Sequence, residues 1–227
     1  MSEQKCAIIG NGPSRILFYD RKEQWTQKVG CNFPDPKMGC EYSAMADSYA
    51  ARLLRKQARH HSRLGEFRLI LSDRAYRGLK SCKDQPAGTQ TCLDYFLAED
   101  IIEDRVEYPR IFQENQKFFN SGHLAFMWAS RKWPKSEFHM FGFDSIFTGE
   151  HRLTYSNVDV REYSSYTPER EVLEEMRPST ENWINNWNVL FDMERDNYSK
   201  VVFHGYEGDK DLPFTGDIEV YAHLHSR

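Results

Sequence analysis

The sequence lacks any run of about 18 apolar residues, the length that a membrane-spanning helix needs. Its first residues, MSEQKC, carry neither the apolar stretch nor the small-residue cleavage site of a secretory signal. Neither sign of charge dominates, because 34 acidic residues face 30 basic ones and the net charge is −4, so no global field favours nucleic acid or anionic lipid. These absences predict a cytoplasmic protein with no stable membrane span and no nucleic-acid partner.

Cysteine is scarce and has no metal-binding spacing. The five cysteines are odd in number and form no C-x-x-C pair, which argues against a disulfide framework and a zinc knuckle. We predict free thiols at Cys6, Cys31, Cys40, Cys82 and Cys92. Three other short patterns could bind a metal in principle: Asp209-Lys210-Asp211, His60-His61, and His223 with His225. We interpret the first as a solvated turn, the second as a helix surface and the third as a tail, so we expect no metal site.

Apolar runs alternate with helical patterns along the chain. The expected strands are 5–10, 27–33, 42–47, 67–73, 137–144 and, last, 200–208, with a weaker edge or loop candidate at 105–112 that contains Pro109. Expected helices cover 48–63, 121–133 and two segments on either side of Pro178, the second with Trp183 and Trp187 as core residues. The basic residues of 51–63 are interpreted as a solvated helix face, with a polyanion-binding patch as the alternative.

Strands that alternate with helices are typical of a parallel sheet, because parallel neighbours need a crossover connection. We therefore predict an α/β fold: a single Rossmann-like, mostly parallel sheet flanked by helices. Residues 1–227 are expected to form one nucleotide-binding domain with a lid-like insertion at 147–170. Polar residues follow several of the expected strands, and parallel sheets bind ligands at the carboxyl ends of their strands. These residues are the turn Gly10 to Ser14, Asn32, Asp47, Asp144 and His204.

The turn Gly10-Asn11-Gly12-Pro13-Ser14 raises two possibilities. It departs from the dinucleotide fingerprint G-x-G-x-x-G, because Arg15 occupies the place of the third glycine, and the chain contains no G-x-x-x-x-G-K-[ST] loop. The glycines serve either a tight turn or the close approach of a ligand to the backbone.

Two further stretches favour a ligand. Asn32 ends an expected strand in KVGCNFPDP, and Ser121-Gly122 opens an expected helix that is followed by a strand ending in Gly142-Phe143-Asp144. A helix that begins Ser-Gly offers amide N–H groups and a positive dipole end to a phosphate. In this order the pieces resemble the sialyltransferases, most closely the bacterial ones with a G-N-G-P-S turn, a later C-N-x-F, S-G-x-x-x-x-x-A and G-[FI]-D. They resemble more loosely the eukaryotic sialyl-motif enzymes and the pterin-diphosphokinase-like proteins.

The resemblance implies a glycosyltransferase that moves a sugar, sialic-acid-like, from a CMP-activated donor to an acceptor glycan or small molecule, with inversion and without metal or other cofactor. Asn11 and Ser14 match the turn that faces the donor's phosphate and sugar, and Asn32 matches the asparagine that contacts the nucleotide. Ser121 with Gly122 matches the helix opening that holds the donor. Phe143 and Asp144 match the G-[FI]-D strand end and its acidic residue.

The chain departs from the bacterial family at the catalytic histidine, where it has Met176 or Arg177. We expect a displaced general base at His204, with His151 as the alternative, because imidazole accepts a proton near neutral pH. Arg177 is a candidate partner for the leaving phosphate. Two other functions stay open: a diphosphokinase-like nucleotide enzyme that needs magnesium and ATP, and a non-catalytic module that binds a nucleotide or sugar.

Overall fold

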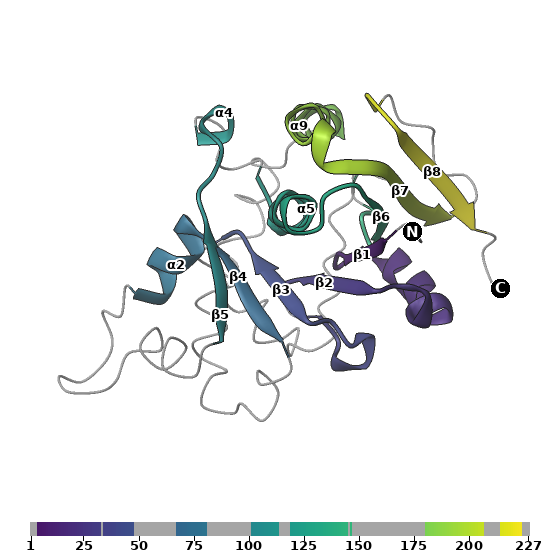
Figure 1. Cartoon of the computed structure of the whole chain (residues 1–227), viewed down its shortest axis with the longest axis horizontal. Coiled ribbons are helices and arrows are strands. Elements are labelled where there is room, and N and C mark those ends of the chain that lie inside the picture. The colour runs from purple at the N-terminus through teal and green to yellow at the C-terminus, as the bar shows by residue number, and fades with distance from the viewer. Residues whose placement is uncertain are drawn as a thin grey trace, which may run out of the picture.

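The computed structural model describes residues 4–32, 34–47, 67–80, 101–113, 119–144, 146, 180–206 and 214–223. They form one eight-stranded sheet in the order β5-β4-β3-β2-β1-β6-β7-β8, and every neighbouring pair is parallel (Figure 1). The strands are β1 Lys5–Ile9, β2 Gln27–Cys31, β3 Tyr42–Met45, β4 Arg68–Ser72, β5 Ile102–Val106, β6 Ser136–Phe141, β7 Tyr198–Tyr206 and β8 Ile218–His223. The prediction of an α/β fold with a parallel sheet flanked by helices is confirmed.

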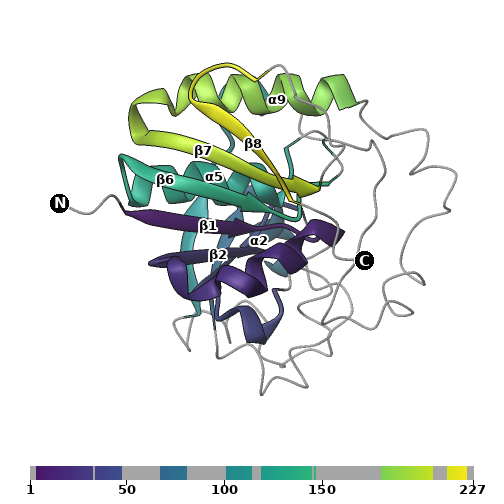
Figure 2. The ribbon, with the colours of Figure 1, turned by 90° about the vertical axis from the view of Figure 1, so that its right-hand side faces the viewer.

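Helices cover both faces of the sheet. The 3-10 helix η1 (Pro13–Gln24) packs on one face, and the α-helices α5 (Ser121–Lys132) and α9 (Thr180–Met193) pack side by side on the other (Figures 1 and 2). The remaining helices in the described part of the chain are η2 Pro36–Met38, α2 Asp73–Lys80, α4 Arg110–Gln113 and η6 Arg195–Asn197.

Both faces of the central strands are apolar, as expected for a parallel sheet between two helical layers. Alternate residues of β1 separate the two cores: Ile8 packs under α5 and α9, whereas Ile9 packs under η1. Trp187 on α9 is 1% exposed and belongs to the larger core, which confirms its predicted burial. The Trp183 side chain lies outside the described residues.

Three elements differ from the sequence prediction. β7 is not the last strand, because β8 pairs with it at the edge of the sheet. β5 lies at Ile102–Val106, earlier than the predicted 105–112, and Pro109 instead precedes α4. The segment after β1 forms η1, with Pro at the first helical position, where its missing N–H costs nothing.

The buried thiols Cys6, Cys31 and Cys40 are free, as predicted, and burial raises the pKa of each above its ordinary value. Cys82 and Cys92 lie outside the described residues, as do the predicted helix 48–63, the predicted lid 147–170, His60-His61 and Asp209 to Asp211. None of the helices in the described ranges combines the length and the apolar character required to cross a bilayer. The same ranges contain no group of three or more His, Cys, Asp or Glu that could hold a metal ion.

Candidate functional site

The candidate site lies where the strand order reverses, between β1 and β6. The turns that leave these two strands pack directly against each other. The Gly10 amide donates to the Phe141 carbonyl at 2.7 Å, and the Gly12 amide donates to the Gly142 carbonyl at 2.9 Å. A methyl group at Gly10 would overlap the Gly142 carbonyl oxygen, so glycine is required for this approach.

The last residue of the Gly10 to Ser14 turn donates hydrogen bonds to the carboxylate of Asp144, which follows β6 in the other half of the sheet. The Ser14 amide donates to both oxygens of Asp144 at 3.1 Å, and the Ser14 hydroxyl donates to Asp144 Oδ2 at 2.9 Å. The Gly142 amide donates to Ser14 Oγ at 3.1 Å. Asp144 therefore supplies a negative charge at the N-terminus of η1, where the helix dipole favours it. The sequence suggested that Ser14 donates to a phosphate. In the structure, its backbone amide and its hydroxyl donate to this carboxylate instead.

A second polar cluster joins the ends of β2 and β3 to the start of α5. The Ser121 hydroxyl donates to Asn32 Oδ1 at 2.8 Å and accepts from the Ala46 amide at 3.1 Å. Asn32 has a φ of 59°, in the left-handed region that asparagine tolerates better than most residues. Because Oδ1 is engaged by Ser121, the Nδ2 group is the part of Asn32 that can donate to a ligand.

The start of α5 is fixed by a capping box. Asn120 Oδ1 accepts from the His123 amide at 3.0 Å, and His123 Nδ1 accepts from the Asn120 amide at 3.1 Å. Burial lowers the pKa of His123 to about 3, so its imidazole is neutral and its Nδ1 stays an acceptor at neutral pH. The amides of Ser121 and Gly122 complete the first turn, which is the part of a helix that binds anions.

Gly122 and Phe143 connect the two clusters. A methyl group at Gly122 would overlap the Phe143 ring, which is buried against Trp187 with 5.7 Å between ring centroids. Phe143 immediately precedes Asp144, so contacts run without a break from Asn32 through Ser121, Gly122, Phe143 and Asp144 to Ser14.

The remaining residues predicted at this edge lie beside these clusters. Asn11 lies in the turn between Gly10 and Gly12, and Asp47 follows Ala46 at the end of β3. The Ala46 carbonyl accepts from the Ser72 hydroxyl at 2.5 Å and from the Tyr108 hydroxyl at 2.6 Å, which fixes the backbone just before Asp47. The structure therefore brings the turn, Asn32, Ser121, Gly122, Phe143 and Asp144 together at one edge of the sheet.

His204 lies elsewhere than the sequence suggested. It stands two residues before the end of β7, on the η1 face, and is 2% exposed. Its ring is stacked on Phe141 with 4.1 Å between centroids and an interplanar angle of 8°. Its Nε2 lies 2.8 Å from Nδ1 of His139. The expectation that His204 follows the last strand was wrong, because β7 continues past His204 to Tyr206 and β8 pairs along its edge.

Sequence reasoning did not single out His139 or Glu137, which extend the buried cluster of His204 along β6. Nε2 of His139 lies 3.0 Å from Glu137 Oε1. Residues 137 and 139 alternate on one strand, so the sequence could have placed both side chains on the same face of the sheet. It could not show that they lie beside His204, because that depends on the register between β6 and β7. Arg177 and His151, the two other catalytic candidates, lie outside the described residues.

A cavity of about 450 Å³ lies at the opposite end of α5 from Ser121. Its three cations are engaged in ion pairs within the protein: Arg105 with Asp73, Arg131 with Glu194 and Lys132 with Glu103. The lining residues are Asp104, Arg105, Val106, Glu107, Trp128, Arg131 and Lys132. It shares no residue with the site at the carboxyl edge.

Comparison of the chain with models of known protein families, with curated proteins and with solved structures found no match.

Proposed function

We propose that the protein is a glycosyltransferase of the sialyltransferase type, which takes a sugar from a CMP-activated donor and passes it to an acceptor glycan or small molecule. The unbroken series of contacts from Asn32 to Ser14 across the reversal of strand order supports this proposal. It joins the segments that carry the sialyltransferase-like motifs, although they are far apart in the sequence.

The charges in the site favour one position for the donor phosphate under this proposal. The carboxylate of Asp144 already accepts from the Ser14 amide and hydroxyl, and it would repel a second anion there. The phosphate is therefore expected at the first turn of α5, near the Ser121 and Gly122 backbone amides, with the side-chain Nδ2 of Asn32 donating to the nucleotide. Neutral N–H donors and the helix dipole then stabilise the departing CMP.

Calorimetry with CMP, UDP, GDP and ATP tests the nucleotide. We expect CMP to bind and Asn32→Ala to weaken it about tenfold, since losing one hydrogen bond to a ligand costs about 1.4 kcal/mol. Asn188→Ala is the matched control, because Asn188 is also half-buried but its Oδ1 accepts from the Thr215 backbone amide, which precedes β8. Clear affinity for another nucleotide with none for CMP contradicts the proposal, and magnesium-dependent ATP binding would indicate a diphosphokinase-like enzyme.

A second function, a non-catalytic module that binds a nucleotide or sugar, is favoured by one observation. His204, the expected general base, is 2% exposed and lies against His139. Such a module would bind CMP without hydrolysing a CMP-sugar. Slow donor hydrolysis that disappears in His204→Ala would exclude it, provided that the variant melts as the parent protein does.

A further inference from the structure

Asn32 is held at three of its polar groups. Its backbone amide donates to the Ala44 carbonyl at 2.9 Å, and its backbone carbonyl accepts from the Ser43 hydroxyl at 2.6 Å. Its side-chain Oδ1 accepts from the Ser121 hydroxyl at 2.8 Å. Its φ of 59° is costly for a residue other than glycine, and such a conformation persists where the surroundings enforce it. Residues in this conformation are concentrated at ligand sites, which directs attention to what the Asn32 side chain does.

The hydrogen bonds of Ser121 run in one direction. Its hydroxyl oxygen accepts from the Ala46 backbone amide at 3.1 Å. Its proton goes to Asn32 Oδ1, the only acceptor that the described part of the chain provides for it. If the carboxamide were turned by 180°, Nδ2 would face the Ser121 oxygen and the hydroxyl proton would lose this acceptor. The series from the Ala46 N–H through the Ser121 O–H therefore decides which end of the Asn32 carboxamide faces Ser121.

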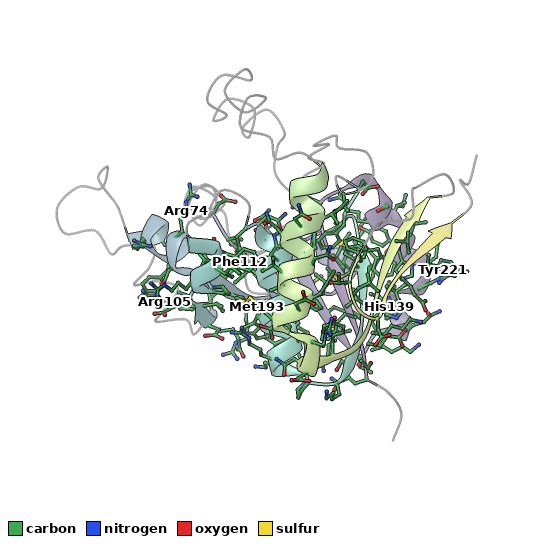
Figure 3. The ribbon with its side chains drawn as sticks, turned by 90° about the horizontal axis from the view of Figure 1, so that it is seen from above. Arg74, Arg105, Phe112, His139, Met193 and Tyr221 are labelled. Atoms are coloured by element: carbon green, nitrogen blue, oxygen red, sulfur yellow. The ribbon has the colours of Figure 1, made fainter. Side chains whose placement is uncertain are left out.

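The backbone at Ala46 is fixed from the other side by buried residues. Its carbonyl accepts from the Ser72 hydroxyl at 2.5 Å and from the Tyr108 hydroxyl at 2.6 Å. The Tyr108 ring packs edge-on against Phe119 with 4.5 Å between centroids, and Phe119 packs against Phe112. All four of these side chains are buried, and Figure 3 shows Phe112 between α2 and α9. The core of the protein thus sets the position of the Ala46 amide, and through it that of the Ser121 hydroxyl.

We propose that Ser121 is a positioning residue whose hydroxyl acts on the ligand through Asn32. The hydroxyl holds Oδ1, so that Nδ2, which donates to no atom of the described residues, is presented to the ligand. An NH₂ group without a lone pair binds only an acceptor, so the ligand atom at this place is an oxygen or an unprotonated ring nitrogen. A cytosine ring offers both. The inference rests on the proposed function in one respect, namely that the ligand is CMP.

A double-mutant cycle separates a positioning hydroxyl from one that contacts the ligand. Calorimetry measures CMP binding to the full chain, to Ser121→Ala, to Asn32→Ala and to the double variant. We expect Ser121→Ala to weaken binding about three- to tenfold, the effect of one hydrogen bond. In the Asn32→Ala background it should have no further effect, because no carboxamide is left to orient.

Two results of the cycle would overturn the inference. Equal losses of affinity in both backgrounds would mean that the hydroxyl contacts CMP directly, and an unchanged affinity in Ser121→Ala would mean that Asn32 needs no orientation. Ser130→Ala is the matched control, because Ser130 is also buried on α5, about 13 Å further along the helix. Its hydroxyl bonds the Met127 carbonyl and Glu194, so its loss should leave the affinity for CMP as in the parent.

The orientation of Asn32 can also be observed without a ligand. In the ¹⁵N-labelled full chain, the side-chain NH₂ signals of Asn32 are those that disappear in Asn32→Ala. We expect their ¹H–¹⁵N nuclear Overhauser effect in the parent to match that of the ordered backbone amides, because Oδ1 is held. In Ser121→Ala it should fall to the value of a mobile carboxamide, while Ser130→Ala should leave it unchanged.

A mobile Asn32 carboxamide in the parent protein would overturn the inference, and this measurement decides the question even if Ser121→Ala does not fold. The spectrum is independent of the proposed function. A chain that binds no CMP would refute that function, whereas an ordered NH₂ group that Ser121→Ala releases would still show that Ser121 positions Asn32.

Discussion

Ser14 donates to Asp144 through both its backbone amide and its hydroxyl, although the two residues are 130 positions apart. The contact locks the first turn of the chain to the turn after β6, across the line where the strand order reverses. A carboxylate of the protein thus accepts from the Ser14 amide at the start of η1, which is why our proposal puts a ligand's phosphate at the start of α5 instead.

Asp144→Asn should destabilise the protein by about 1–2 kcal/mol, because hydrogen bonds to a charged acceptor are stronger than those to a neutral one. Urea denaturation measures the loss. Asp192→Asn is the control, since Asp192 forms only an exposed pair with Arg195 in the described structure, and pairs of that kind contribute little. Equal stabilities for the two variants would mean that the Asp144 charge has no structural role.

Gly10→Ala should be among the most damaging single substitutions, because the new methyl group meets the Gly142 carbonyl oxygen, which belongs to the backbone of the neighbouring turn. Overpacking at such a site costs about 1–3 kcal/mol. We expect a lower midpoint in thermal unfolding and the loss of CMP binding at temperatures where the variant is still folded. An unchanged midpoint would show that the two turns do not pack as described.

Gly122→Ala should displace the Phe143 ring, and with it Asp144. A smaller side chain at 143 would make room for the methyl group. The double variant Gly122→Ala with Phe143→Leu should therefore lose less unfolding free energy than the two single variants lose in total. Residues in direct contact show interaction energies of about 0.5–3 kcal/mol in such double-mutant cycles. Additive losses of stability would contradict the contact.

Stability should fall as the solution is acidified below about pH 6.5. Burial lowers the pKa of His123 to about 3 and that of His139 to about 4. Between these values and about pH 6.5, each histidine is protonated in the unfolded chain but stays neutral in the folded protein. Each histidine contributes its full stabilisation above pH 6.5. Each then loses about 1.4 kcal/mol per pH unit on acidification.

His123→Gln isolates one of these contributions. A glutamine at this position retains a partner for the Asn120 amide in the capping box but does not titrate. We expect the difference in unfolding free energy between parent and variant to shrink steadily from pH 7 to pH 4 in urea titrations. A difference that is independent of pH would show that His123 titrates normally.

The sequence predicted the strands that lie inside the sheet, because burial on both faces leaves an apolar run such as Leu69, Ile70 and Leu71 in β4. It did not predict β8, where Glu219 and Tyr221 are exposed and the strand lies at an edge. It also missed η1, because the apolar residues there do not form a regular stripe, and Ile16 is 59% exposed.

Part of the candidate site followed from the sequence alone. Parallel strands bring their carboxyl ends to one edge, so the meeting of Asn32 with Ser121 could be expected. That Asp144, rather than a ligand, binds Ser14 could not be expected, because strand order and register decide which turns face each other. The same holds for His139 and His204, which meet only through the alignment of β6 with β7.

The location of the site at the boundary between two halves of the chain has a consequence during synthesis. The segment through β5 can form its side of the sheet first, but the turn at Ser14 gains its carboxylate only when residue 144 has emerged and β6 has paired with β1. The turn at Ser14 is therefore completed late in synthesis, and any fragment that ends before β6 should be unable to form it.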